Sequence, residues 1–325
     1  MRKRVRNAAL VALGLLLATL GGGWAYQLVG SARDAAAYRP VGTLHEVAGH
    51  RMHLYLGGRG PATVVFASGW GTASPYADFS PLYDELESYA NVAVYDRFGY
   101  GFSDTTGRPR EIDAIVDELH ALLEAGGAKP PFVFVGHSLG ALEAIRYAQR
   151  YPDDVKGLLM VDGGSPEYYA SRDGLTIIPY TYRALRVTGA LRALYHADGF
   201  EAWANDQSNG LLHLSDDMRE LSRKATLLKT GNRDMTDEIR KSRSNAQRIL
   251  EGGKPLDVPI TVLTADYFGA LSEDLEWESS QAAFPSWSRA GKQIVVEDTS
   301  HYIHSYRPDV VVREALALAL AGVEN

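Results

Sequence analysis

Short apolar runs alternate with amphipathic segments along most of this chain. The runs lie at residues 63–67, 92–95, 132–135, 158–161, 260–263 and 293–296. Because each run is continuously apolar, it is typical of a parallel strand that is covered on both faces. Residues 112–123 place their apolar side chains on one helical face, and Gly126-Gly127 ends that segment. The alternation predicts right-handed βαβ units in an open, twisted sheet.

Two regions depart from this alternation. Residues 44–56 alternate apolar and polar side chains, which predicts an antiparallel hairpin before the sheet. Residues 165–253 contain no clear buried strand, but they include helix-like pieces at 182–195 and 216–229. We expect this region to be a helical cap, inserted over the carboxyl edge of the strands, where open α/β sheets place their ligands.

The first thirty residues have a composition of their own. Four basic residues within positions 2–6 precede an apolar stretch from Ala8 to about Val29, and no charge falls between Asn7 and Arg33. About twenty such residues are enough to cross a bilayer as a helix. The pattern predicts a membrane anchor or signal segment over 1–30, a linker over 31–42 and one globular domain over 43–325.

The sequence is compatible with two fates of this segment: retention as a membrane anchor or cleavage as a signal peptide. Trp24 and Tyr26 resemble an interfacial aromatic belt, which favours a retained, single-pass anchor in the cell membrane. The positive-inside rule then leaves the N-terminus in the cytoplasm and the globular domain on the extracytoplasmic side. The alternative is secretion after cleavage, because Gly23-Trp24-Ala25 matches a small-x-small cleavage site.

Composition narrows the possible chemistry and partners. The 325-residue chain carries a formal charge of −7, and without its four N-terminal cations the remainder carries −11. An acidic body without a basic stripe argues against nucleic acid as a partner. The chain has no cysteine, which excludes a disulfide framework, a thiolate metal site and a thiol nucleophile.

The strongest chemical signal is Gly136-His137-Ser138-Leu139-Gly140, between the apolar run 132–135 and a helix-like segment over 141–150. A serine in a tight strand-to-helix turn points its hydroxyl away from the sheet. Glycines flank it because the strand and the helix pack too closely there for a Cβ. The motif predicts that Ser138 is a nucleophile.

A serine nucleophile needs a base, and the usual base is a histidine oriented by a carboxylate. His301 follows the last apolar run and is the predicted base, while His304 is expected to pack beside a final helix that Arg307-Pro308 opens. The other histidines considered are expected to be ordinary strand or turn residues: His45, His50, His53 and His137.

The acid has two candidates. Asp162 follows the run 158–161, and Asp266 follows the run 260–263, so either could reach the second nitrogen of His301. The residues after Asp266, Tyr-Phe-Gly, lack the short acidic turn expected of an acid at that strand. This slightly favours Asp162, and the other carboxylate is expected to stabilise a loop.

Two loops supply the remaining parts of the predicted site. An oxyanion hole needs two backbone N–H groups, for which we predict Leu139 and Trp70, the latter in the turn Ser68-Gly69-Trp70-Gly71. The glycine-rich segment 95–104 is expected to be structural, with Asp96 and Arg97 fixing the loop through ion-pair hydrogen bonds.

Together these motifs resemble the α/β-hydrolase family, with the match running from Val47 to the C-terminus. The resemblance implies a mostly parallel eight-stranded sheet with helices on both faces, an inserted helical cap, and catalysis without a cofactor or metal. The N-terminal segment resembles that of a bacterial membrane-anchored subgroup. Two positions depart from the family pattern: Ser68 stands where many members have histidine, and the acid after the penultimate strand is displaced.

The nucleophile position indicates the reaction class. Related haloalkane dehalogenases and epoxide hydrolases use aspartate there, so Ser138 argues against both activities. We expect a serine hydrolase that cleaves a carboxylic ester or related acyl compound, with an apolar small molecule as substrate. Alternatives are an acyltransferase or carbon–carbon bond hydrolase on the same triad, or a non-catalytic ligand sensor.

Overall fold

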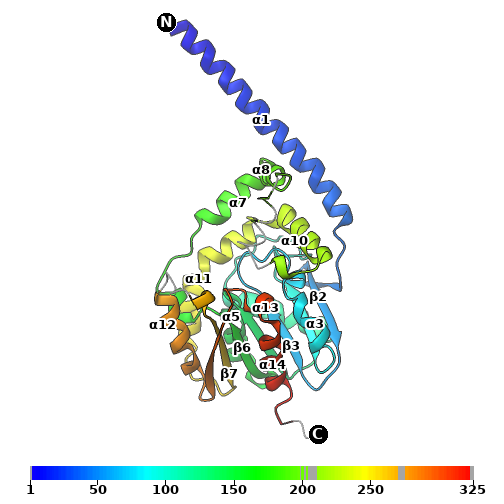
Figure 1. The fold of residues 1–325 in the computed structure, drawn as a ribbon, viewed down its shortest axis with the longest axis vertical. Helices are drawn as coiled ribbons and strands as arrows, with labels where there is room; N and C mark the ends of the chain where they lie inside the picture. The colour runs from blue at the N-terminus through cyan, green and yellow to red at the C-terminus, as the bar shows by residue number, and fades with distance from the viewer. Residues whose placement is uncertain (1, 198, 201–202, 204–210, 270–274, 323–325) are drawn as a thin grey trace.

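The computed structural model of this chain describes residues 2–197, 199–200, 203, 211–269 and 275–322. Its centre is an eight-stranded sheet in the order β1-β2-β4-β3-β5-β6-β7-β8 (Figure 1). The strands β1 and β2, and β2 and β4, pair antiparallel, and all other neighbours are parallel. The strands are β1 (Thr43–Val47), β2 (His50–Gly58), β3 (Thr63–Ala67), β4 (Asn91–Asp96), β5 (Phe132–His137), β6 (Val155–Val161), β7 (Ile260–Ala265) and β8 (Gly291–Val296).

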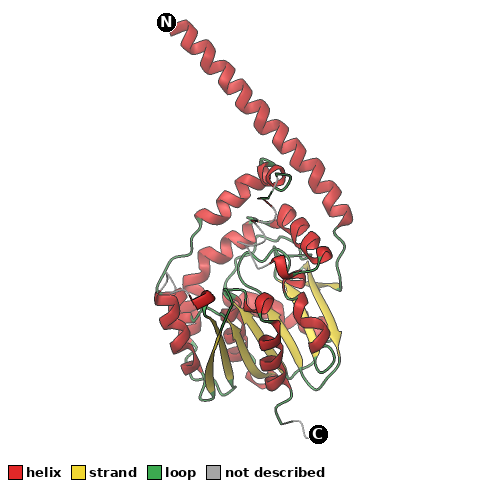
Figure 2. Cartoon of the chain, viewed as in Figure 1, coloured by secondary structure: helices red, strands yellow, loops and turns green. Residues whose placement is uncertain are grey.

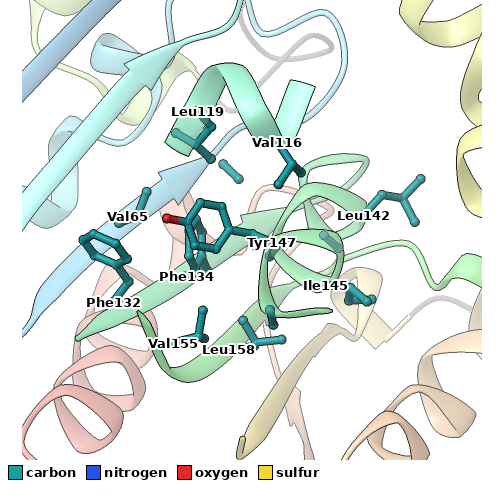
Figure 3. Packing of buried hydrophobic residues seen from close by; sticks show 14 of the residues in the cluster. Val65, Val116, Leu119, Phe132, Phe134, Leu142, Ile145, Tyr147, Val155 and Leu158 are labelled. Carbon is teal, nitrogen blue, oxygen red and sulfur yellow. The ribbon is translucent and has the colours of Figure 1, made fainter. Parts of the chain in front are cut away.

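Helices cover both faces of the sheet (Figure 2). On one face, Phe134 and Leu158 of the sheet pack against Leu119 of α4 (Ile112–Gly126) and Ile145 of α5 (Gly140–Arg150), as Figure 3 shows. A second buried cluster on the opposite face includes residues of α14. Outside the cap and the N-terminal helix, the other α-helices are α2 (Pro75–Asp78), α3 (Tyr83–Leu86), α12 (Leu275–Ala283), α13 (Ile303–Tyr306) and α14 (Pro308–Ala319).

The predicted apolar runs all lie within strands of this sheet, and the predicted hairpin is formed by β1 and β2, with Val47 opposite His50. The last strand differs from the expectation that both of its faces are covered. Most residues of β8 are exposed, because it lies at the edge of the sheet and has a strand neighbour only in β7. The predicted α/β fold class is otherwise confirmed.

A helical segment follows β6 and precedes β7, where the cap was predicted. It contains α6 (Pro166–Ala170), α7 (Ile177–Val187), α8 (Ala190–Leu194), α10 (Asp216–Lys229) and α11 (Arg233–Glu251). The single helical piece expected over 182–195 is broken at Gly189, whose φ is +74°. A side chain at Gly189 would overlap the Gly23 backbone, so the break lets the cap meet the N-terminal helix closely.

The N-terminal helix α1 (Arg2–Ala37) is longer than predicted, because residues 31–37 of the expected linker are helical. Alanines at 35–37 favour helix, and Asp34 is held by Arg192 of the cap (Asp34 Oδ2 to Arg192 Nη1, 2.6 Å). Residues 2–22 are exposed and extend away from the body (Figure 1). By length and composition α1 can span a membrane, as a signal sequence also could.

Candidate active site

The segment around Ser138 has the predicted strand–turn–helix geometry. Ser138 lies between the end of β5 and the start of α5, and its φ is +52°, a left-handed conformation that side chains rarely adopt. A Cβ on Gly136 would lie 2.9 Å from the Ala141 Cα, and one on Gly140 would overlap the Ala67 carbonyl. The flanking glycines are therefore required by close packing, and the strained turn presents the Ser138 side chain above the end of the strand.

His301 is hydrogen-bonded to Asp162. The distance from His301 Nδ1 to Asp162 Oδ2 is 2.6 Å, and Asp162 is fully buried. Asp162 also accepts hydrogen bonds from the Tyr267 hydroxyl (2.7 Å) and the Ala265 amide (3.2 Å). Since an ionised carboxylate only accepts, His301 carries its proton on Nδ1, which leaves Nε2 free to accept a proton.

Asp266, the alternative acid, faces a different set of groups. Its carboxylate accepts hydrogen bonds from the backbone amides of Phe268 (3.0 Å), Asp298 (3.1 Å) and Thr299 (3.1 Å). Partial burial raises the pKa of Asp266, but these amides outweigh that effect and the net pKa is lowered. Asp266 thus ties the loop after β7 to the loop after β8, which carries His301.

Buried side chains lie behind the His301 backbone. The His137 ring packs 4.7 Å from the His301 ring, centre to centre, and its Nε2 lies 3.1 Å from the His301 carbonyl oxygen. Because a carbonyl only accepts, His137 donates this bond from Nε2, and burial lowers the pKa of His137 well below its ordinary value. The neutral His137 ring therefore supports the backbone of His301.

His304 lies directly before the final helix, beside which it was expected to pack, and it also pairs with a buried carboxylate. It lies in α13 and its Nε2 is 3.1 Å from Oδ2 of Asp78 on α2, with both side chains buried. Asp78, His137 and His304 also place potential metal-ligand atoms within 4.8 Å of one another. Two of these groups are already bonded to each other and the third to the His301 carbonyl, so we interpret the cluster as support for the loop of His301.

Two aromatic side chains, one from the cap and one from α12, complete the surroundings of the turn. The Tyr169 side chain, on α6, lies near the Ser138 side chain. The Trp277 ring of α12 contacts the His301 ring edge-on at 5.7 Å, centre to centre. Sequence reasoning missed Tyr169, Trp277 and Tyr267, because isolated aromatic residues give no signal until the fold brings them to the site.

The predicted oxyanion turn lies against Ser138. A Cβ on Gly69 would lie 3.1 Å from the Ser138 Cβ, so glycine allows this close approach. The Trp70 indole donates to the Met235 carbonyl of α11 (2.8 Å), which links the turn to the cap. Within the described part of the chain, the backbone N–H groups of Trp70 and Leu139 have no hydrogen-bond acceptor.

Arg97 fixes the predicted oxyanion turn by hydrogen bonds to its backbone carbonyls. Its guanidinium is buried and donates to the carbonyls of Ser68 (2.8 Å) and Gly69 (3.0 Å). It is also paired with two buried carboxylates, Glu143 of α5 and Glu238 of α11, the latter at 3.3 Å. Burial raises the pKa of Glu238 to about 7. Arg97 therefore connects the turn, the helix after Ser138 and the cap.

Replacing Arg97 with methionine should lower the free energy of unfolding by about 3–5 kcal/mol, because it leaves buried carboxylates without a cation. Urea denaturation would measure this loss. The matched variant Arg97→Met/Glu143→Gln/Glu238→Gln removes the stranded charges and should recover much of the stability. Equal stability of the two variants would show that the charges of Glu143 and Glu238 do not depend on Arg97.

His53 is not the ordinary strand residue that was expected. It is fully buried, with Nδ1 2.8 Å from Asp96 Oδ2 and Nε2 2.8 Å from the Val41 carbonyl. Asp96 also accepts from the Phe102 amide (2.8 Å), as expected of a residue that fixes its loop. Burial lowers the pKa of His53, but Asp96 outweighs burial and the net pKa is raised.

This raised pKa predicts a pH-dependent contribution to stability. A group that binds its proton more tightly when folded stabilises the fold fully below its unfolded pKa, about 6.5 for histidine. That contribution is lost as the pH rises through the folded-state pKa. Urea denaturation between pH 6 and 9 should therefore show wild type losing more stability than His53→Asn. Parallel pH curves for the two proteins would contradict this prediction.

A cavity of about 360 Å³ lies between the cap and the oxyanion turn. Trp70 and Gly71 line it on the turn side, next to Gly69, and Tyr302 lines it beside His301. Its cap side is largely apolar. The cap residues that line it include Ile178, Tyr182, Leu191, Phe200 and Trp203. Ile178 is also exposed, as are its neighbours Ile177 and Tyr180, which do not line this cavity.

A sequence profile described as the alpha/beta hydrolase family matches residues 64–314. The chain therefore belongs to this family, and it is an enzyme of the hydrolase fold. A Bacillus subtilis (strain 168) protein, YbdG, of uncharacterized function, is 27% identical over 289 residues, or 86% of each chain. A pimeloyl-[acyl-carrier protein] methyl ester esterase of Xylella fastidiosa (strain M12) is 34% identical over 110 residues, which cover 34% of this chain and 39% of the esterase.

Solved structures agree with this fold. The enol-lactonase from Burkholderia xenovorans LB400 superposes with a TM-score of 0.62 at 16% identity, covering 85% of this chain and 99% of the lactonase. At this level of identity the likeness concerns the fold alone, and the substrate has to be argued from the site of this chain.

Proposed function

We propose that this protein is a serine hydrolase that cleaves a carboxylic ester or a related acyl compound through Ser138, His301 and Asp162. The observation that carries the proposal is the 2.6 Å hydrogen bond between His301 and the buried Asp162, next to a serine in a strained turn. Asp266 is assigned to the loop that carries His301, because its carboxylate is occupied by backbone amides.

The reaction has two acyl-transfer steps. Ser138 Oγ attacks the carbonyl carbon while His301 Nε2 takes the hydroxyl proton. The bond from this carbon to the leaving oxygen breaks, and His301 returns the proton to that oxygen, which leaves an acyl-serine. Water then adds to the same carbon, with His301 again taking the proton. Release of the acid breaks the bond to Ser138 Oγ, which regains its proton from His301.

The negative charge that develops on the substrate oxygen needs donors. We assign this role to the backbone N–H groups of Leu139 and Trp70, which have no acceptor among the described residues. Arg97 acts as a positioning residue, because it binds the Ser68 and Gly69 carbonyls and so orients the turn that carries the Trp70 amide. Asp162 acts through His301, whose tautomer it sets.

Covalent labelling tests the proposal. The purified chain is treated with a fluorophosphonate, and its modified residue is located by peptide mass spectrometry. We expect one phosphonyl group per chain, located on Ser138, and hydrolysis of a short-chain ester that the probe blocks. Labelling elsewhere, or binding of esters without turnover or labelling, would favour the ligand-sensor alternative. If added alcohol were converted to an ester in preference to hydrolysis, the protein would be an acyltransferase. If only carbon–carbon bonds were cleaved, it would be a carbon–carbon bond hydrolase.

We further propose that α1 is retained as a single-pass anchor, with the N-terminus in the cytoplasm and the catalytic domain outside it. Residues on both sides of the candidate cleavage site contact the cap: Gly23 packs on the Thr188 backbone, and Gln27 donates to the Leu227 carbonyl (2.9 Å). The intact mass of the mature protein tests retention, because secretion after cleavage would remove about the first 25 residues.

A further inference from the structure

The cap segment that meets α1 has an unusual composition for this acidic protein. Residues 174–197 contain three arginines and no acidic residue. They also expose large apolar side chains. Among the described residues beyond α1, half of the exposed large hydrophobic residues lie between 175 and 203: Leu175, Ile177, Ile178, Tyr180, Tyr182, Val187, Leu194 and Trp203. An apolar, cationic surface of this kind is typical of helices that lie in a membrane interface.

The contacts of α1 fix the height of this segment relative to a bilayer. About twenty residues cross the hydrocarbon core, so a span that begins after the last N-terminal cation, Arg6, ends near Tyr26. Trp24 and Tyr26 are exposed at that level, as aromatic residues of an interface are. Gly23 packs on Thr188, at the turn between α7 and α8. The turn therefore lies at the level where the bilayer ends.

The junction between α1 and the cap is built to hold one orientation. Arg192 bonds to Asp34 (2.6 Å) and to the Gln27 side chain (3.0 Å), and all three side chains are buried. Gly30 allows close approach, because a Cβ there would meet the Arg192 guanidinium. Figure 1 shows α7 and α8 between α1 and the sheet. An anchored α1 would therefore present the cap, rather than the sheet, to the membrane.

The arginines of this cap segment would favour contact with an anionic lipid surface. Arg192 is paired with Asp34, and Arg186 donates to the Thr230 carbonyl (2.7 Å). Arg183 has no acidic partner among the described residues. It lines a cavity of about 370 Å³ together with Arg233, Arg240 and Lys241. Arg240 is paired with Asp237, Lys241 with Glu111, and Arg233 donates to the Thr106 carbonyl, so Arg183 is the cation of this lining that has no acidic partner or side-chain hydrogen bond among the described residues. The phosphate of an anionic lipid is a suitable ligand for the Arg183 guanidinium at this edge of the cap.

We propose that α7 and the α7–α8 turn lie in the interface of the bilayer that α1 spans, and that the substrate is a lipid-dissolved ester with a long acyl chain. This inference rests on the proposed ester hydrolysis and names its substrate class. Ile178, Tyr182 and Trp203 are exposed and also line the cavity between the cap and the oxyanion turn. They form a continuous apolar route from the cap surface to Trp70 and Tyr302, so an acyl chain can enter from lipid.

The position of the cap can be tested without an activity assay. The chain has no cysteine, so Ile177→Cys and Val295→Cys can each carry one environment-sensitive fluorophore. Both native side chains are well exposed, at 69% and 59%. In full-length protein in phosphatidylcholine–phosphatidylglycerol vesicles, the label at 177 should shift to the blue and be quenched by nitroxide lipids. The label at 295 should remain aqueous. Aqueous spectra at both positions would overturn the proposal.

A second measurement tests the substrate class. Leu175→Ser/Ile177→Ser removes two exposed cap residues that line neither cavity, and Tyr89→Ser/Val295→Ser removes two of similar exposure elsewhere. Hydrolysis of a long-chain ester dissolved in the vesicles should fall about tenfold or more in the cap variant only, since two apolar side chains that insert into lipid are lost. A short, soluble ester should be hydrolysed at the wild-type rate by both variants.

The two arms separate the possible failures. Equal hydrolysis of the vesicle ester by the cap variant and the control variant, with the soluble ester still cleaved, would overturn the membrane-entry inference and leave the proposed function standing. Failure of wild type to cleave either ester, together with no labelling of Ser138, would overturn the proposed function itself. Loss of soluble-ester activity in the cap variant would also contradict the inference, because it would place Leu175 or Ile177 in the chemistry.

Discussion

Ser138→Ala should reduce kcat for ester hydrolysis by roughly 10⁴–10⁶, the loss seen when a serine nucleophile is removed from a triad. Without Oγ no acyl-enzyme can form, and only binding and the oxyanion donors remain to act on water. The fold should be retained, because alanine has the same Cβ as serine and fits the same turn. Initial-rate kinetics and urea denaturation measure the two effects.

A matched serine variant separates loss of the nucleophile from loss of a buried hydroxyl. Ser288 is buried and donates to the Val258 carbonyl (2.7 Å), away from the turn. Ser288→Ala should keep full activity and lose about 0.5–1.5 kcal/mol of stability. Wild-type turnover by Ser138→Ala would show that another residue is the nucleophile.

Asp162→Asn should reduce kcat about 10⁴-fold, as in a triad whose histidine is held in the wrong tautomer. Asp162 Oδ2 receives both the His301 ring and the Tyr267 hydroxyl, while Oδ1 receives the Ala265 amide. An asparagine has only one acceptor oxygen, so its NH₂ group must replace one of the two carboxylate oxygens. If the NH₂ group faces the Ala265 amide, two donors oppose each other. If it faces His301, the ring must accept at Nδ1 and carry its proton on Nε2. Nε2 could then no longer accept the Ser138 proton.

Asp266→Asn is the matched control for this variant. It loses charge-assisted bonds to backbone amides in the loop that carries His301, but no contact with the His301 ring itself. Its activity should fall less than about tenfold, with a loss of stability below about 2 kcal/mol. If instead Asp266→Asn lost activity about 10⁴-fold and Asp162→Asn did not, the acid would be Asp266.

Local sequence determined much of this protein. The apolar runs specified the strands, because residues covered on both faces must be continuously apolar. The Gly136–Gly140 motif specified the turn of Ser138, because only a glycine-flanked turn allows strand and helix to approach so closely. The uncharged stretch over 8–29 specified a helix that can span a membrane. Each of these features depends on neighbours in the chain, so a pattern can report it.

Features that join distant segments were decided by the tertiary structure. Asp162 and Asp266 each follow a strand, and the sequence favoured Asp162 only slightly. Only the packing of β6 and β7 against the last loop brings Asp162 to His301. The burial of His53 against Asp96 depended in the same way on β2 lying beside β4.

The docking of the cap on α1 was likewise decided by the tertiary structure. Asp34 and Arg192 are separated by most of a domain in sequence, and neither belongs to a motif. A pattern along the chain records which residues are apolar or charged, but it does not record which residue another segment brings opposite them. The partner of a buried charge is set by the fold, because an isolated charge is stable inside a protein only where the packing supplies its counter-charge.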